Sequence, residues 1–152
     1  MSLSICPSGD ERVQLFGLLI ETNARLERTL GQALEESCGL PLNWFFVLLQ
    51  LRRSPEGRLK MSEIADATVH SSGGTTRLID RIVEAGYVER RLCPSDRRAI
   101  HVELTARGNE VLDLALGAHL EHLESHLTAR LDLEERTALS RLLEKLNEGV
   151  TG

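Results

Sequence analysis

The sequence predicts a mainly α-helical fold with one small β-hairpin. Leucines recur at helical spacing toward both ends of the chain, which indicates long amphipathic helices. Near the middle, two helical segments are separated by a short turn, and two alternating segments joined by an arginine-rich turn follow directly. Two helices joined in this way form a helix-turn-helix, and a hairpin placed after them forms a wing. We therefore expect a winged helix-turn-helix module that binds duplex DNA, embraced by helices from both ends.

The composition excludes a membrane span and a secreted disulfide scaffold. The chain is 41% apolar and 27% charged, and no apolar run approaches the roughly 20 residues that a membrane helix needs. The N-terminus lacks the basic and apolar segments of a secretory signal. Cys6, Cys38 and Cys93 are widely spaced and form neither a CxxC pair nor a disulfide framework. We therefore expect a cytoplasmic protein.

The first predicted helix runs from Asp10 to Leu34. Its apolar positions include Leu15, Leu19, Leu26, Leu30 and Leu34, and the apolar surface is widened by Val13, Phe16, Leu18 and Ile20. One neighbouring layer does not need so much apolar surface, so part of it is expected to face another subunit. Gly39 and Pro41 then break the chain.

The next segment supplies the first half of the helix-turn-helix. Leu42 to Arg53 is apolar almost throughout, which predicts a buried helix, and Arg58 to Lys60 is a candidate strand after a turn. Ser62 is expected to cap a short helix from Glu63 to Ala67. Residues 68–70 then form the turn before the second helix.

The second helix is expected to lie in the major groove of DNA. Ser71 can cap its first turn, and Gly86 is suited to the left-handed residue that ends it. Its inward face is predicted to carry Thr75, Leu78, Ile79, Ile82 and Ala85, and its outward face Gly73, Arg77, Asp80, Arg81 and Glu84. Gly73 and Gly74 stand in the first turn, where they either let the backbone approach bases closely or are simply tolerated at a helix start.

The hairpin consists of Val88 to Leu92 and Ile100 to Leu104. In the second strand Ile100, Val102 and Leu104 are expected to face inward, because they alternate with polar residues. The connecting turn carries Arg97 and Arg98, and adjacent guanidinium groups suit the negative potential of a narrow minor groove.

Two further helices complete the chain. Thr105 is expected to cap a helix that runs to about Arg130, with a stripe formed by Leu112, Leu116, Leu120, Leu123 and Leu127. Asp132 and Glu135 have the spacing of a capping box and predict the start of a last helix. Gly149 is expected to end that helix.

The distribution of charge favours a DNA-binding middle. The net charge is −5, which by itself argues against a polyanionic partner. The stretch from Arg52 to Arg107, however, contains eleven basic and eight acidic residues and has a net charge of +3. The charges of the remaining residues sum to −8. A basic middle between acidic flanks would orient the molecule on DNA.

The run MSEIADA from Met61 to Ala67, the following SSGGTTRLIDRIVEAG and the wing SDRRAIHVELTARG resemble the MarR family of bacterial transcriptional regulators. The most specific part is the wing signature, here Asp96, Arg98, Leu104, Thr105 and Gly108. The resemblance covers nearly the whole chain. It implies a single domain over residues 1–152, in which about 10–38 and 106–148 are dimerisation helices and about 42–105 form the DNA-binding module.

The resemblance also implies a function. We expect a homodimeric repressor that binds a pseudo-palindromic operator with half-sites one helical turn apart, roughly 34 Å. In this family a small-molecule ligand or an oxidant commonly relieves repression. No Ser/His/Asp set, phosphate loop or zinc-protease motif is present, so an enzyme is not expected, and neither is a cofactor.

The resemblance and the basic residues together predict the DNA contacts. Arg77 is expected to contact a guanine edge, the alternative being an exposed arginine paired with Asp80 or Glu84. Arg98 is expected in the minor groove with Asp96 bonded to its guanidinium, although Asp96 could instead serve only the turn. The remaining predicted contacts are Lys60, Ser71, Ser72, Gly74, Thr76, Arg81, Arg91 and Arg97.

Three further features leave alternatives open. His119, His122 and His126 share one side of the predicted long helix at a spacing compatible with a metal, although a boundary or dimer-interface role fits as well. Cys6 is either an oxidant-sensing thiol or inert. Trp44 either belongs to the core or lines a pocket for an aromatic ligand. A metal- or oxidant-sensing regulator is therefore the alternative function.

Overall fold

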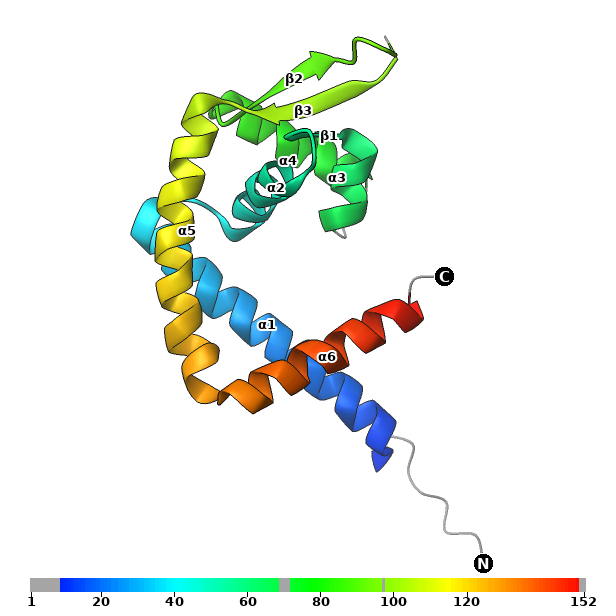
Figure 1. Cartoon of the computed structure of the whole chain (residues 1–152), viewed down its shortest axis with the longest axis vertical. Coiled ribbons are helices and arrows are strands. Elements are labelled where there is room, and N and C mark those ends of the chain that lie inside the picture. The colour runs from blue at the N-terminus through cyan, green and yellow to red at the C-terminus, as the bar shows by residue number, and fades with distance from the viewer. Residues whose placement is uncertain (1–8, 69–71, 97, 151–152) are drawn as a thin grey trace, which may run out of the picture.

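The computed structural model of this chain describes residues 9–68, 72–96 and 98–150. Its elements in chain order are α1 (Glu11–Cys38), α2 (Leu42–Arg53), β1 (Arg58–Lys60), α3 (Met61–Thr68), α4 (Ser72–Glu84), β2 (Val88–Leu92), β3 (Ile100–Leu104), α5 (Ala106–His126), the short 3₁₀ turn η2 (Thr128–Arg130) and α6 (Leu133–Val150). Helices α2 to α4 and the strands form a lobe, and α1, α5 and α6 extend away from it as a stem (Figure 1). The expected mainly helical fold with a winged hairpin is confirmed.

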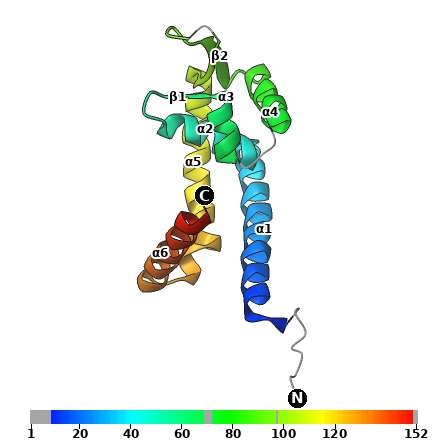
Figure 2. The same cartoon turned by 90° about the vertical axis from the view of Figure 1, so that its right-hand side faces the viewer.

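The sheet has three antiparallel strands in the order β1-β3-β2. Leu59 of β1 lies opposite Val102 of β3, and Val88 of β2 lies opposite Leu104. The candidate strand at residues 58–60 is thus a real strand, which pairs with the hairpin along its inner end. The outer end of the hairpin projects beyond the lobe (Figure 2).

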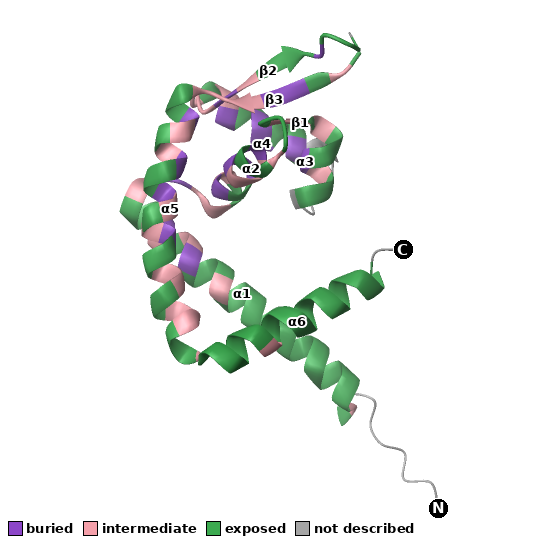
Figure 3. Cartoon of the chain, viewed as in Figure 1, coloured by how far each residue is buried: buried purple, intermediate pink, exposed green. Residues whose placement is uncertain are grey.

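One hydrophobic core fills the lobe and reaches into the stem. Its fully buried side chains come from every helix except α6 and from all but the first strand: Leu34, Leu40, Phe45, Val47, Leu48, Leu51, Ile64, Ile79, Ile82, Val88, Val102, Leu112 and Ala115. Because Leu112 and Ala115 belong to α5, the upper half of that helix is part of the lobe's core. Figure 3 shows the buried positions gathered in the lobe and where it meets α1 and α5.

Asp10 caps α1, and the predicted capping box of Asp132 with Glu135 and the predicted left-handed Gly86 are confirmed. The Asp10 carboxylate accepts from the backbone N–H of Arg12 at 2.9 Å, and Asp132 and Glu135 form the reciprocal capping box at 2.9 Å in each direction. Gly39 and Gly86 have φ of 68° and 79° and follow the last turns of α1 and α4. A left-handed residue at this position closes a helix by satisfying its last carbonyls, and glycine adopts it without strain.

Three details of the local predictions are wrong. Ser62 does not cap α3, because the helix begins at Met61 directly from β1, and the Glu63 carboxylate accepts from the backbone N–H of Lys60 at 2.6 Å. Gly149 does not end α6, which continues to Val150. Helix α1 also runs one turn beyond Leu34.

The inward alternation of β3 fails at its outer end. Val102 is fully buried as expected, but Ile100 is 43% exposed while His101 is 8% exposed. Ile100 lies opposite Leu92 near the hairpin tip, beyond the reach of the core. His101 is on the central strand between Lys60 and Arg91, and the long side chains of such neighbours can cover a residue.

Helix α6 stands apart from the rest of the chain. It crosses in front of α1 in Figure 1, but the perpendicular view in Figure 2 separates the two helices widely. None of its residues is buried. None of the helices in the described ranges is both long and apolar enough to cross a bilayer.

The lobe and the stem are joined where β3 passes into α5. The Thr105 hydroxyl donates to the carbonyl oxygen of Gly86 at 2.6 Å and accepts from the backbone N–H of Gly108 at 3.0 Å. The backbone N–H of Thr105 donates to the carbonyl oxygen of Tyr87 at 3.1 Å. Gly108 is buried so closely against Tyr87 that a Cβ atom would overlap the Tyr87 backbone. Thr105 and Gly108, two residues of the wing signature, therefore join the lobe to the stem.

We predict that Gly108→Ala destabilises the protein by about 2 kcal/mol or more, because backbone must move to make room for the methyl group. The matched control is Gly117→Ala on the same helix, where a Cβ atom has open space. That control should be neutral or stabilising by up to about 1 kcal/mol. Thermal unfolding of the two variants measures the difference, and equal midpoints would contradict the role assigned to Gly108.

Candidate DNA interface

Helix α4 presents a polar face to solvent because its other face is held in the core. Thr75 is 1% exposed, Leu78 is 7% exposed and Ile79 is fully buried, which fixes the rotation of the helix about its axis. The outward side chains are therefore exposed on the opposite face: Thr76, Arg77, Asp80 and Arg81, with Gly74 in the same exposed turn. This matches the predicted division of the helix into two faces.

Asp80 does not pair with Arg77, as one alternative held. Its carboxylate instead pairs with Arg90 of β2 at 2.6 Å, so the ion pair ties the outer face of α4 to the wing. Arg77 and Arg81 are one turn apart on the exposed face of this helix. The contact of Arg77 with a base stays a prediction.

The turn of the wing is closed by Asp96. Its carboxylate accepts from the backbone N–H of Arg98 at 3.0 Å, and its carbonyl oxygen accepts from the N–H of Ala99 at 3.0 Å. The backbone N–H of Cys93 donates to the carbonyl oxygen of Ala99 at 2.9 Å. The Asp96 carboxylate thus bonds to the backbone and not, as expected, to the guanidinium of Arg98. An Asx turn of this kind satisfies the carboxylate locally. The side chain of Arg98 is exposed at the tip.

Arg91 differs from the other predicted phosphate contacts. Its guanidinium pairs with Glu89 at 2.6 Å and with Glu103 at 3.4 Å, on the outer face of the sheet. The hydrogen bonds that Arg91 donates to the Glu89 carboxylate raise the pKa of Arg91, so the guanidinium stays charged while the two carboxylates offset its charge. Lys60 is exposed on the edge strand β1.

Part of the predicted contact set is not covered by the structure. Ser71 and Arg97 lie outside the described residues, as does Cys6. Ser72 is the first residue of α4, and its side chain is outside the description as well. The remaining predicted residues lie on the exposed surfaces of α4 and of the sheet: Lys60, Gly74, Thr76, Arg77, Arg81, Arg91, Asp96 and Arg98.

The three histidines of α5 do not converge on one site. His119 is buried against the Phe45 ring, with 4.7 Å between ring centroids. His122 is hydrogen-bonded to Ser37 of α1 at 3.0 Å, and His126 lines a groove with α1 further along the stem. In the part of the chain that the structure describes, no three His, Cys, Asp or Glu side chains are grouped so as to hold a metal. The geometry therefore gives the metal-sensing alternative no support.

Trp44 is half-buried and has a packing role. Its ring meets Tyr87 edge-on at a centroid distance of 6.1 Å, and the Arg107 guanidinium lies over the other ring at 5.4 Å. These contacts brace the start of the wing against α2. The tryptophan thus belongs to the margin of the core, as its simpler interpretation held.

A pocket that the sequence did not predict lies next to Trp44 in the chain. It has a volume of about 260 Å³ and is lined by Asn43 of α2 and by Gly74, Arg77, Leu78 and Arg81 of α4. The spacing of Arg77 and Arg81 on one helix face was visible in the sequence, but the approach of Asn43 to that face was not.

Comparison with known proteins places this geometry in a family. A model described as the MarR family matches residues 39–99, which include α2, the helix-turn-helix and most of the wing. The transcriptional repressor MprA of Escherichia coli K12 is 30% identical over 136 residues, covering 90% of this chain and 76% of MprA.

The chain belongs to the MarR family.

Solved structures of MarR-family proteins extend the likeness to the whole fold. The regulator Sco3205 of Streptomyces coelicolor in complex with DNA superposes with a TM-score of 0.84 at 28% identity, covering 94% of each chain. A mutant of E. coli MarR in complex with operator DNA gives 0.79 at 28% identity, covering 90% of this chain and 95% of that one. The same mutant without DNA gives 0.72 at 26% identity, covering 94% and 98%.

This chain is therefore a DNA-binding transcriptional regulator. Its relatives are transcriptional regulators, which are not enzymes. The family signature coincides with the residues that join the lobe to the stem and close the wing: Asp96, Arg98, Leu104, Thr105 and Gly108.

We predict that Arg98→Ala lowers affinity for a cognate DNA duplex about tenfold, because a free guanidinium leaves the wing tip. Arg91→Ala is the matched control on the same hairpin and should change affinity less than about threefold, since two carboxylates already neutralise that guanidinium. Fluorescence anisotropy at near-physiological salt measures both. A larger loss for Arg91→Ala would reverse the assignment.

Proposed function

We propose that this chain is a homodimeric transcriptional repressor that binds a pseudo-palindromic operator and is released by a small-molecule effector. The observation that carries the proposal is the pairing of two exposed arginine-bearing elements, α4 and the wing, on one lobe of a stem whose apolar faces are uncovered.

The exposed apolar faces of the stem support the proposed dimer. On α1, Phe16 is 65% and Leu18 is 63% exposed, and on α6, Leu142 and Leu146 are each 51% exposed. Figure 3 shows this exposure along α6 and the N-terminal half of α1. Apolar patches of this extent on a single chain mark an interaction surface. A second copy that brings its own α1 and α6 would cover them, which supports segments 10–38 and 106–148 as dimerisation helices.

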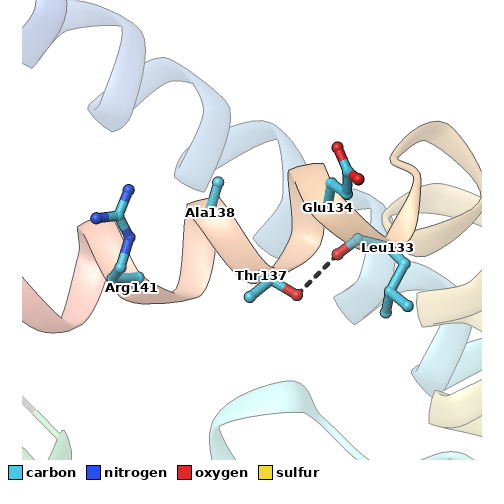
Figure 4. A pocket seen from close by; sticks show the side chains of 5 residues that line it. All are labelled: Leu133, Glu134, Thr137, Ala138 and Arg141. Atoms are coloured by element: carbon cyan, nitrogen blue, oxygen red, sulfur yellow. Dashed lines mark hydrogen bonds between the residues drawn. The ribbon is translucent and has the colours of Figure 1, made fainter.

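A hollow on α6 supports the same interpretation. It has a volume of about 430 Å³, and its five lining residues, from Leu133 to Arg141, all belong to this one helix (Figure 4). The Thr137 hydroxyl donates to the carbonyl oxygen of Leu133 at 2.8 Å and is thereby satisfied. A hollow with a wall on one side only is suited to the side chains of a neighbouring helix and not to an enclosed ligand.

The lobe supports binding in two kinds of groove. In a dimer, the two copies of α4 would enter successive major grooves on one face of the duplex, and each Arg98 would reach a flanking minor groove. The chain superposes on the operator-bound MarR mutant with a TM-score of 0.79 and on the DNA-free mutant with a TM-score of 0.72. This supports the interpretation that the described conformation is competent for DNA binding.

The pocket beside α4 supports relief by an effector. A small aromatic acid bound between Asn43, Arg77 and Arg81 would attract both guanidinium groups and withdraw them from the DNA. The name of the relative MprA, a transcriptional repressor, favours repression as the direction of control. Binding of the effector would then release the operator.

We predict that Leu142→Glu converts the dimer to monomer, because a carboxylate would be buried in an apolar interface. Operator affinity should fall at least about a hundredfold, since the two half-sites are no longer bound together. Glu144→Gln, on the opposite side of α6, is the control and should remain dimeric. Analytical ultracentrifugation and anisotropy test both variants, and a monomeric native protein would overturn the proposal.

A second experiment tests the operator geometry. Selection of bound duplexes from a random library should yield two half-sites related by a dyad. Lengthening their spacing by about five base pairs turns one half-site to the opposite face of the helix. Binding should then be lost, and retention of affinity would contradict a rigid two-lobed dimer.

The effector pocket is tested with benzoate as the probe. We predict that millimolar benzoate weakens operator binding by the native protein, and that Arg81→Ala retains measurable DNA binding but loses most of this response. Isothermal titration of benzoate in the absence of DNA provides the matched measurement. An equal response in the variant would remove the pocket from the mechanism.

A further inference from the structure

A buried histidine lies where the stem meets the lobe. His119 of α5 is 8% exposed, and its ring packs on Phe45 of α2, which is fully buried. The Nδ1 atom of His119 is buried and has no hydrogen-bond partner. A buried polar atom without a partner costs free energy, and the cost rises when the ring takes up a proton. Neutral His119 is therefore the form that this packing accepts.

The neighbouring histidine, unlike His119, has a hydrogen-bond partner on another helix. His122 lies one turn further along α5, and its Nε2 is 3.0 Å from the Ser37 hydroxyl of α1. That hydroxyl donates its own hydrogen to the carbonyl oxygen of Ala33 at 2.7 Å. Its oxygen must therefore accept from His122, so Nε2 carries the hydrogen. The ring of His122 thus links α5 to α1 through this hydrogen bond.

The charged groups near His119 do not favour its protonated form. Burial lowers the pKa of His119 below its ordinary value of 6.5, and the charge of His122 lowers the pKa further. From α2, Arg52 faces α5 in an ion pair with Asp113 at 2.9 Å, so their charges cancel. From α1, the Cys38 thiol is part-buried and donates to the carbonyl oxygen of Leu34, while Glu35 and Glu36 are exposed. None of these carboxylates compensates a proton on His119.

Acid removes the contribution of His119 to the stability of the folded state. A histidine whose pKa is lower in the folded state than in the unfolded state binds its proton less well when folded. Its contribution to stability is complete above pH 6.5 and is lost as the pH falls from there through the lowered pKa. Acid therefore acts against the contact between α5 and α2.

We propose that His119 is a proton-operated switch for DNA binding, in which protonation loosens the contact of α5 with α2 and releases the lobe from its operator-binding position. The proposal rests on the proposed dimeric function, because the angle between stem and lobe sets the separation of the two α4 helices only in a dimer. In the described arrangement His119 packs on Phe45, and the chain superposes on the operator-bound MarR mutant with a TM-score of 0.79. A shift away from this packing would therefore lower operator affinity.

The test compares the native protein with His119→Phe, which keeps an aromatic ring on Phe45 but cannot take a proton. Operator affinity is measured by fluorescence anisotropy at about pH 7.5 and about pH 5.5, across the range in which histidine titrates. We expect the native protein to lose at least about threefold more affinity than His119→Phe over this interval. Other histidines, including His101 on the wing, are common to both proteins, so the difference isolates His119.

His122→Gln is the matched control on the same helix. Its amide can donate to Ser37, and it removes the charge that disfavours protonation of His119. The loss of affinity should therefore persist in this variant and begin at a higher pH. An acid response in His119→Phe equal to that of the native protein would overturn the proposal, and so would the absence of any response in the native protein.

A measurement without DNA separates this proposal from the proposed function. The thermal unfolding midpoint of the native protein should fall on acidification by several degrees more than that of His119→Phe, because only the native protein carries the linked proton. If no operator is bound at about pH 7.5, the repressor proposal fails while this comparison still tests the titration of His119. Equal shifts of the two midpoints would show that His119 takes up no linked proton and would overturn the switch.

Discussion

The Thr105 hydroxyl is the contact on which the arrangement of this protein depends. It donates to the carbonyl oxygen of Gly86, just after α4, and accepts from the backbone N–H of Gly108 in the first turn of α5. Since Thr105 also follows β3 directly, one side chain holds together α4, the wing and the stem. Gly108 permits the contact because a side chain there would overlap the backbone of Tyr87. Tyr87 in turn packs between Trp44 and Arg107 and braces the junction from the side.

This junction fixes how the charged side chains of α4 and of the wing are placed relative to each other. The ion pair between Asp80 and Arg90 ties α4 to the wing, and Arg91 is neutralised by two carboxylates. The arginines of the lobe are therefore not equivalent, because some of them stabilise the lobe and others, such as Arg77 and Arg98, extend from it. Under the proposed function, an acidic stem behind a basic lobe would favour the approach of DNA along α4 and the wing.

The stem serves a different physical purpose from the lobe. Its upper part shares the core of the lobe through Leu112 and Ala115, whereas α6 contributes no buried residue in the single chain. The stem is therefore packed into the core of the lobe at one end and carries exposed apolar faces at the other. In the proposed dimer, a change at the attachment, where His119 contacts Phe45, would be transmitted along the stem to the partner.

Sequence alone determined the elements of this protein. Leucine periodicity and capping residues such as Thr105 and Asp132 predicted the helices and most of their ends, because these signals act within one turn of backbone. The wing signature of Asp96, Arg98, Thr105 and Gly108 indicated the family for a related reason, since each residue meets a fixed local geometry. The tertiary structure decided which polar groups are available. It paired Asp80 with Arg90, directed Asp96 to the backbone, covered His101 and separated three histidines that share a helix. These outcomes depend on side chains that lie far apart in the chain and meet only when the sheet, α2 and α5 have packed together, so no spacing within the sequence encodes them.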